Sequence, residues 1–213
     1  MRKYLYTTLL LALLAQEGVM AQENEGKTGG FFGKIKDTFS TEIKIGNYTF
    51  KDGSVYTGEM KGRKPNGKGK TVFKNGDVFE GEYVKGKREG YGIYMFPDGE
   101  KYEGQWFQDQ QHGKGIYYFM NNNRYDGMWY QDYQHGEGTM YYHNGDLYVG
   151  KWVNDKREGE GTYTWANGAK YTGHWKNDKK NGKGIMNWDD GCKYEGDWKD
   201  DVRHGKRSEE HTS

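Results

Sequence analysis

Small or aromatic residues alternate with polar ones in short stretches of this chain, and this two-residue period is typical of β-strands. In residues 67–73, two glycines, a threonine and a phenylalanine occupy every second position. A similar stretch covers residues 78–84, after the pair Asn75-Gly76. Because Asn-Gly favours tight turns in which both residues have positive φ, we predict a β-hairpin with its turn at this pair.

The hairpin pattern recurs at a constant spacing, since Tyr56, Phe79 and Tyr102 are each 23 residues apart. Each copy has a ring, a glycine two positions later and, in all but the first, a second ring two positions after that. The seven central glycines are Gly58, Gly81, Gly104, Gly127, Gly150, Gly173 and Gly196. A fixed period of this length is typical of stacked supersecondary units, so we expect function on a surface built by repetition.

Strand alternation sorts the side chains of each hairpin onto two faces. One face should carry the rings and three glycines per repeat, equivalent to Gly58, Gly67 and Gly69, over which neighbouring rings lie flat. The other face should be largely charged, as at Glu80 and Glu82. The predicted fold is therefore all-β: an elongated, single-sheet antiparallel meander of about seven 23-residue hairpins.

Composition favours an ordered chain with an aromatic core. Mean hydropathy is −1.18, and Leu147 is the only leucine after Leu14, so aliphatic side chains cannot form the core. Aromatic residues make up 16% of the chain, and each ring buries a large area. A formal net charge of +1 argues against a nucleic-acid partner, because such proteins usually have a basic excess. Cys192 is the only cysteine, which excludes an intrachain disulfide.

The first 21 residues have the layout of an export signal. Arg2 and Lys3 precede an apolar stretch, Tyr4–Ala15, and small residues lie just before Gln22. We predict a signal peptide over residues 1–21 with cleavage before Gln22, which implies an exported protein, periplasmic or extracellular. An uncleaved membrane anchor is the alternative.

Residues 22–47 form a predicted linker and N-terminal cap before the repeat array, residues 48–206. The 31–39 segment has apolar side chains at i, i+4 and i+8, and residues 42–45 alternate like a strand. Two interpretations remain open, a cap over the first hairpin and a basic amphipathic element on a membrane surface. The cap is favoured, because one or two helical turns bury little apolar area.

Residues 207–213 interrupt the repeat register. Arg207 stands where the other copies have glycine, and the stretch resembles the in-frame translation of a common sequencing adapter. We expect this tail to be non-native, with the natural chain continuing past Lys206.

The repeated pattern Asp-Gly-x-x-Tyr-x-Gly-x-Trp, followed by Gly-x-Gly, resembles the MORN repeat (membrane occupation and recognition nexus). The resemblance covers about residues 48–206, with Met60 in place of a ring, and Asn122 and Arg207 in place of glycine. It implies an elongated single-sheet scaffold, which often pairs into homodimers and often associates with membranes or acidic phospholipids. Some members of the family carry lipid-kinase or methyltransferase domains, and this sequence shows neither.

Catalytic, cofactor and metal motifs are weak. Residues 62–69 imitate a phosphate-binding loop, but glycine stands where Ser or Thr must reach magnesium. His112, His135 and His204 share one repeat position, yet neighbouring repeats lie about 10 Å apart, too far for one zinc ion. We therefore predict a protein that is not an enzyme and binds neither cofactor nor metal.

Two surfaces remain as candidates for binding. The first is a groove lined by the rings of the middle repeats: Tyr102, Trp106, Tyr125, Trp129, Tyr148, Trp152, Tyr171 and Trp175. The second is the loop edge, where basic clusters flank a glutamine-rich gap; its candidate residues are Arg63, Lys64, Lys87, Arg88, Lys156 and Arg157. The groove would bind a protein or an envelope component, and the edge would bind an anionic phospholipid or polysaccharide.

Three functional hypotheses follow. The first is a non-enzymatic exported scaffold that mediates protein–protein or envelope interactions through the groove and the loop edge. The alternative is a peripheral binder of anionic phospholipid membranes, acting through the basic loops and the 31–39 segment. The third is a hydrolytic or sugar-binding protein that uses the groove. Near-neutral charge gives weak long-range steering and so favours a protein partner in the groove.

Overall fold

The structure, a computed structural model, describes residues 42–205 and 209–210. Every described residue belongs to one compact unit. The predicted signal peptide, the 31–39 segment and most of the tail lie outside the described residues. The described strands are β1 (Ile43–Thr49), β2 (Val55–Lys61), β3 (Lys64–Val72), β4 (Val78–Val84), β5 (Lys87–Met95), β6 (Lys101–Phe107), β7 (Gln110–Tyr118), β8 (Arg124–Tyr130), β9 (Tyr133–Tyr141), β10 (Leu147–Val153), β11 (Lys156–Thr164), β12 (Lys170–Lys176), β13 (Lys179–Asn187), β14 (Lys193–Lys199), β15 (Val202–His204) and β16 (Glu209–Glu210).

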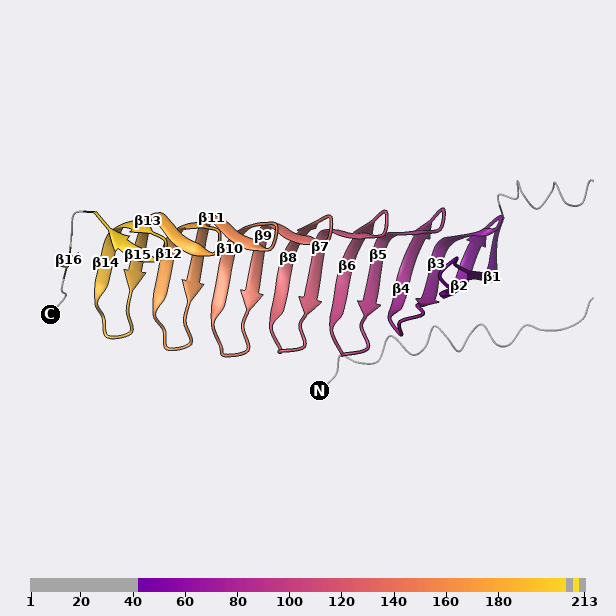
Figure 1. Ribbon diagram of the computed structural model, residues 1–213, viewed down its shortest axis with the longest axis horizontal. Helices are drawn as coiled ribbons and strands as arrows, with labels where there is room; N and C mark the ends of the chain where they lie inside the picture. The colour runs from indigo at the N-terminus through magenta and orange to yellow at the C-terminus, as the bar shows by residue number, and fades with distance from the viewer. Residues whose placement is uncertain (1–41, 206–208, 211–213) are drawn as a thin grey trace, which may run out of the picture. The chain divides into compact units, whose positions relative to one another are not determined.

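Strands β1 to β15 follow one another in chain order within a single open antiparallel sheet, and β16 pairs with β14 (Figure 1). The described residues contain no helix. The predicted single-sheet meander of hairpin repeats is confirmed. Strand β1 pairs along its full length with β2, so residues 43–47, which we assigned to the cap, continue the sheet.

The two edges of the sheet have different turns, and both differ from the prediction. In the Asn75-Gly76 turn only the glycine has positive φ, at 94°, and its N–H donates to the Phe73 carbonyl (3.0 Å). The Phe73 N–H also donates to the Asp77 carbonyl (2.9 Å), so the loop between these two residues has three residues, not the two expected. At the opposite edge, where we expected longer loops, strands meet through two-residue turns. In the turns after the first, both residues have positive φ, as at Gln108 (50°) and Asp109 (73°), whereas in the first only Gly62 (62°) does.

A β-bulge lies beside each two-residue turn from β2–β3 to β12–β13, and it changes the role of one glycine series. Gly81 pairs with Gly92, whereas Tyr83 pairs with Arg88, so β5 carries extra residues between these pairs. Gly90 lies in this bulge with a φ of 85°, and a Cβ there would meet a glutamate side chain rather than a ring. Gly90 is the equivalent of Gly67 in the next repeat. This glycine series therefore permits the bulge, and the prediction that it makes room for a ring is wrong.

The core is one layer of interlocking rings. Tyr125 lies across Gly127 and Gly138, and a Cβ on Gly138 would lie 2.3 Å from the Tyr125 hydroxyl. Trp129 stands edge-on between Tyr102 and Tyr125, with both centroid distances 5.3 Å and interplanar angles of 84° and 88°. Edge-to-face packing of this kind stabilises each pair beyond the area it buries. The predicted covering of the other two glycine series by rings is confirmed.

The opposite face is less charged than predicted in the middle of the sheet. Phe107 and Tyr130 are 50% and 48% exposed, and the His112 ring lies between them, with centroids 5.7 and 5.5 Å away. Tyr91 and Tyr141 are also exposed there. Aromatic side chains thus occupy both faces of the middle repeats, although only one face forms the packed core.

Candidate functional site

The eight rings that we predicted to line a groove form the core itself. The four tyrosines are fully buried, and the four tryptophans are only 3–6% exposed. Each ring is enclosed by its neighbours and by the glycines beneath it, so little surface remains for a partner. The prediction therefore fails for Tyr102, Trp106, Tyr125, Tyr148, Tyr171 and Trp175. Of the eight rings, Trp129 and Trp152 line a groove on the same face.

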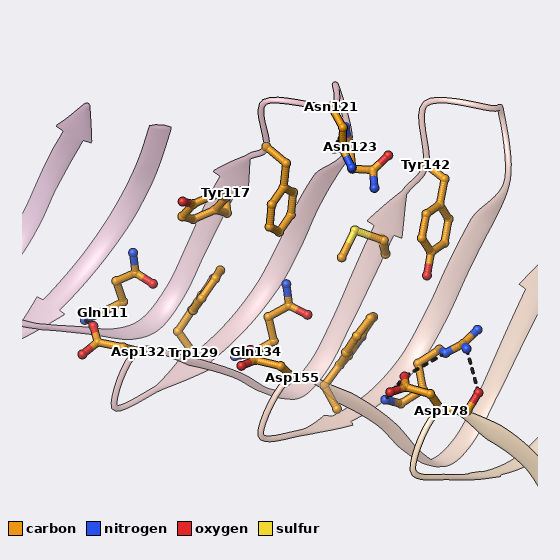
Figure 2. A pocket seen from close by; sticks show the side chains of 14 residues that line it. Gln111, Tyr117, Asn121, Asn123, Trp129, Asp132, Gln134, Tyr142, Asp155 and Asp178 are labelled. Carbon is orange, nitrogen blue, oxygen red and sulfur yellow. Dashed lines mark hydrogen bonds and ion pairs between the residues drawn. The ribbon is translucent and has the colours of Figure 1, made fainter. Parts of the chain in front are cut away.

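A groove of about 530 Å³ lies on the ring face over β7 to β11 (Figure 2). Figure 2 shows carboxylates along the edge of the two-residue turns, and asparagines with a tyrosine along the opposite edge. The side chains at the first edge are Asp132, Asp155 and Asp178, and those at the second are Phe119, Asn121, Asn123 and Tyr142. Between them lie Gln111, Tyr117, Trp129, Gln134, Met140, Trp152 and Arg157. The groove thus combines apolar rings with amides and carboxylates.

The position of the groove depends on one residue of each repeat. This residue follows the two-residue turn and pairs across the strands with the residue at the second-ring position. Its seven occupants are Pro65, Arg88, Gln111, Gln134, Arg157, Lys180 and Arg203. Paired residues share a face of the sheet, so these side chains all lie on the ring face. The two glutamines occur in successive repeats, and both line the groove.

Arg88 and Arg157 each cover the next tryptophan, and Lys180 does so as well, with its Nζ 4.4 Å from the Trp198 centroid. The Arg88 guanidinium lies 4.3 Å from the Trp106 centroid, a cation–π contact. Its Nε lies 3.4 Å from the Asp109 Oδ1, and its Nη2 donates to the Asp109 carbonyl at 2.6 Å. Arg88 and its counterpart Arg157 each have a side chain only 18% exposed. These arginines act as part of the core.

Where the occupant is glutamine, its backbone N–H bonds the turn aspartate, but no cationic side chain from this position covers the tryptophan. The backbone N–H of Gln111 donates to Asp132 (2.7 Å), and that of Gln134 donates to Asp155 (2.8 Å). The two glutamines are 8% and 6% exposed, and Figure 2 shows their amides pointing into the groove. Within the described part of the chain, neither side-chain amide makes a hydrogen bond. The shorter side chain therefore leaves the groove open above it.

The groove carries excess negative charge. Of its charged lining residues, Arg157 is bonded to Asp178, with Nε 3.2 Å from Oδ1 (Figure 2, dashed lines). Among the described residues, no lysine or arginine forms an ion pair with Asp132 or Asp155. Both carboxylates instead accept backbone N–H groups, which hold them at the rim.

The predicted basic edge is only partly accessible. Arg63, Lys64, Lys87 and Lys156 are exposed at the two-residue turns. Arg88 and Arg157 are not loop residues, because each lies in a strand and pairs with a ring-face residue, Tyr83 or Trp152. The expectation that they belong to an anionic-ligand edge is therefore wrong, and removing either would disturb the core. The signal that could have distinguished them is their position: they precede a repeat glycine by two residues, where other copies have Gln111 or Gln134.

The described residues contain no group of three or more His, Cys, Asp or Glu side chains that could hold a metal ion. None of them forms a helix long and apolar enough to cross a membrane.

The model of the MORN repeat family matches seven consecutive segments, residues 56–78, 79–101, 102–124, 125–147, 148–170, 171–193 and 194–206. The chain belongs to the MORN repeat family. MORN repeats form scaffolds for interactions with proteins or membranes. In this MORN protein the matched segments carry the ring core and the groove.

Solved structures that resemble this MORN protein are distant from it in sequence. The TCP domain of Drosophila melanogaster SAS-4, in complex with a proline-rich motif of Ana2, is 13% identical, with 83% of this chain and 97% of that chain covered and a TM-score of 0.44. The TCP10 domain of Danio rerio CPAP, in complex with a STIL peptide, is also 13% identical, with coverage of 72% and 94% and a TM-score of 0.30. Virginiamycin B lyase from Staphylococcus aureus is 12% identical, with coverage of 74% and 60% and a TM-score of 0.18. No curated protein matches the chain in sequence.

Proposed function

We propose that this protein is a non-enzymatic, exported MORN scaffold that binds an extended segment of a protein or envelope component in the groove over β7 to β11. The observation that carries the proposal is the pair of side-chain amides of Gln111 and Gln134, which face the groove and make no hydrogen bond within the described part of the chain. Because these amides open onto the groove, a ligand that replaces water there can bond them directly.

The dimensions of the groove suit an extended segment better than a small molecule. It crosses five strands, which at about 4.8 Å per strand spacing is roughly 19 Å. An extended chain covers this length with about six residues. The rings supply apolar contacts, while the amides and carboxylates at the rim supply orientation.

Binding of anionic phospholipid is the second candidate, because Arg63, Lys64, Lys87 and Lys156 are exposed along one edge. Each basic residue near an anionic membrane contributes about 1 kcal/mol at most. The turn aspartates at the same edge, such as Asp132 and Asp155, oppose this attraction. The groove is therefore the favoured site.

Selection from a displayed library of random peptides tests the groove directly. Peptides enriched on the wild-type protein should bind at least tenfold more weakly to Tyr142→Ala, which removes one wall of the groove. The matched control is Tyr141→Ala, because Tyr141 is 40% exposed on the opposite face. Equal sensitivity to the two substitutions would place the binding surface elsewhere.

Co-sedimentation with phosphatidylserine vesicles tests the second candidate. If the edge binds lipid, binding should fall steeply with salt and disappear when the four exposed basic residues become alanine. If the groove is the functional site, this variant should keep full peptide binding, and vesicle binding should be weak for both proteins.

A further inference from the structure

Two repeats hold an arginine side chain in surroundings that resemble those of the groove. Arg88 and Arg157 lie in different repeats, yet each guanidinium is 4.3 Å from the centroid of the next tryptophan. Each Nη2 donates to a turn aspartate carbonyl, at 2.6 and 2.7 Å, and each Nε approaches the carboxylate, at 3.4 and 3.2 Å. A tryptophan face, a carboxylate and a carbonyl thus form a guanidinium site that the array builds more than once.

The two glutamine repeats keep this site but lack the guanidinium. Trp129 and Asp132 have the positions relative to Gln111 that Trp106 and Asp109 have relative to Arg88. The carboxylate is held in the same way, because the backbone N–H of Gln111 donates to it at 2.7 Å and that of Arg88 at 2.9 Å. A glutamine side chain ends near the Nε of an arginine, so the place of the guanidinium is open.

Gln134 repeats the arrangement one repeat later, with Trp152 and Asp155. The charged residues that line the groove are three aspartates and one arginine, and that arginine is bonded to Asp178. The two carboxylates that remain have no cation of this chain bonded to them within the described residues. The charge and the shape of both sites complement a cationic side chain.

We propose that the groove is a double receptor for arginine side chains of a partner protein. Two partner guanidiniums lie over Trp129 and Trp152 as Arg88 and Arg157 lie over their own tryptophans. Arginine is favoured over lysine, because a planar guanidinium stacks on a ring and bonds a carboxylate and a carbonyl together. This inference rests on the proposed function of the groove and names the chemistry of its occupant.

The spacing of the two sites defines the conformation of the partner. Successive repeats lie two strands, or about 10 Å, apart. A polyproline II helix rises about 3.1 Å per residue with three residues per turn, so residues i and i+3 share one side about 9 Å apart. In a β-strand, residues i and i+3 point to opposite sides. The occupant is therefore a polyproline II segment with arginines at i and i+3.

Calorimetry with a synthetic peptide tests the proposal. The probe is a ten-residue polyproline peptide with arginine at its fourth and seventh positions, and its control has citrulline, the neutral isostere, at both. The full chain should bind the arginine peptide at least tenfold more tightly than the citrulline peptide. Asp132→Asn with Asp155→Asn should remove this preference, since asparagine still accepts the backbone N–H but carries no charge.

A second test uses a self-filling variant, in which this chain supplies its own arginine side chain to each site. Gln111→Arg with Gln134→Arg should place this chain's own guanidiniums in both sites and weaken the arginine peptide at least tenfold, with an unchanged or higher Tm. The matched control is Gln110→Arg with Tyr133→Arg, which adds the same charge on the opposite face, where Gln110 pairs with Phe107 and Tyr133 with Tyr130.

The outcomes separate this inference from the proposed function. Equal binding of the arginine and citrulline peptides, or an arginine peptide that still binds the self-filling variant, would overturn the double receptor. Absence of any binding to the wild-type chain would overturn it as well. In each case, library peptides that remain sensitive to Tyr142→Ala would leave the groove as a binding site of other specificity.

Discussion

Tyr125 covers Gly138 so closely that a Cβ on the glycine would lie 2.3 Å from the tyrosine hydroxyl. The same 2.3 Å separation relates Tyr102 to Gly115. No real Cβ fits at this distance, so the flat tyrosine and the bare glycine require each other. Since the pairing recurs along the sheet, stability depends on glycines that lie in strand interiors, where they would otherwise weaken the sheet.

Replacing one of these glycines should be costly. In Gly127→Val, the new Cβ would lie 2.6 Å from both the Gly138 Cα and the Tyr125 hydroxyl, so ring and backbone must move apart. We expect the free energy of unfolding to fall by about 1–3 kcal/mol or more, the range for overpacked cores. Glu80→Ala on the exposed face should change it by less than about 0.5 kcal/mol. Urea denaturation compares them, and equal shifts would refute the assignment of faces.

Arg88 should contribute to stability although it carries a charge. Arg88→Met removes the contact with Trp106 and both bonds to Asp109, and should lower the free energy of unfolding by about 1–3 kcal/mol. Lys87→Met, one residue earlier and exposed, is the control and should have little effect. Chemical denaturation measures both. A similar loss in the two variants would mean that the ring-face position of Arg88 is unimportant.

Trp129 should be a poor probe of binding because it is a core residue. Its Nε1–H donates to the Gly115 carbonyl (3.1 Å), and its ring packs against Tyr102 and Tyr125. Trp129→Ala should destabilise the protein by about 3–5 kcal/mol, as is usual for a large buried ring. Thermal melting followed by circular dichroism tests this, with Tyr130→Ala as the exposed neighbour. A wild-type Tm for Trp129→Ala would show that the ring layer is not the core.

Alkaline pH should unfold the protein cooperatively. Burial raises the pKa of Tyr83 to about 12, and burial with a hydrogen bond to Glu103 raises that of Tyr91 to about 12. A raised folded pKa means that the contribution to stability is intact below the unfolded value, about 10, and is lost as pH rises through the folded value. Burial lowers the pKa of Lys180, so this group adds stability as pH rises. It is a single group, whereas burial raises the pKa of several tyrosines.

The Tm should therefore be nearly constant up to about pH 9 and should decline between about pH 10 and pH 12. Tyrosinate absorbance recorded during the same titration should rise together with unfolding. A Tm that increases across this range would contradict the expected sign.

Export remains a prediction of the sequence that can be checked directly. Expressed with residues 1–21 in a Sec-competent host, the protein should leave the cytoplasm and begin at Gln22. N-terminal sequencing of the exported fraction measures this. A chain that keeps Met1 would indicate an uncleaved anchor or no export at all.

Local signals in the sequence were sufficient for the repeat, the strands and the ring face. The constant spacing of Tyr56, Phe79 and Tyr102 defines the repeat, and two-residue alternation identifies the strands. The rings and two of the three glycine series were placed on one face because alternation is a property of any extended chain.

The accessible surface could not be predicted in the same way. Alternation from Gly92 through Gly90 puts Arg88 on the ring face, but its burial depends on Trp106 and Asp109 of the next repeat, which alternation within one repeat does not show. Burial of Tyr102 and Trp129 depends on rings from neighbouring repeats, which no single repeat contains. The sequence by itself determined the repeat and its strands, since these rest on contacts between near neighbours. Only the tertiary structure decided which side chains remain open to a partner, since exposure depends on how the adjoining repeats cover each side chain.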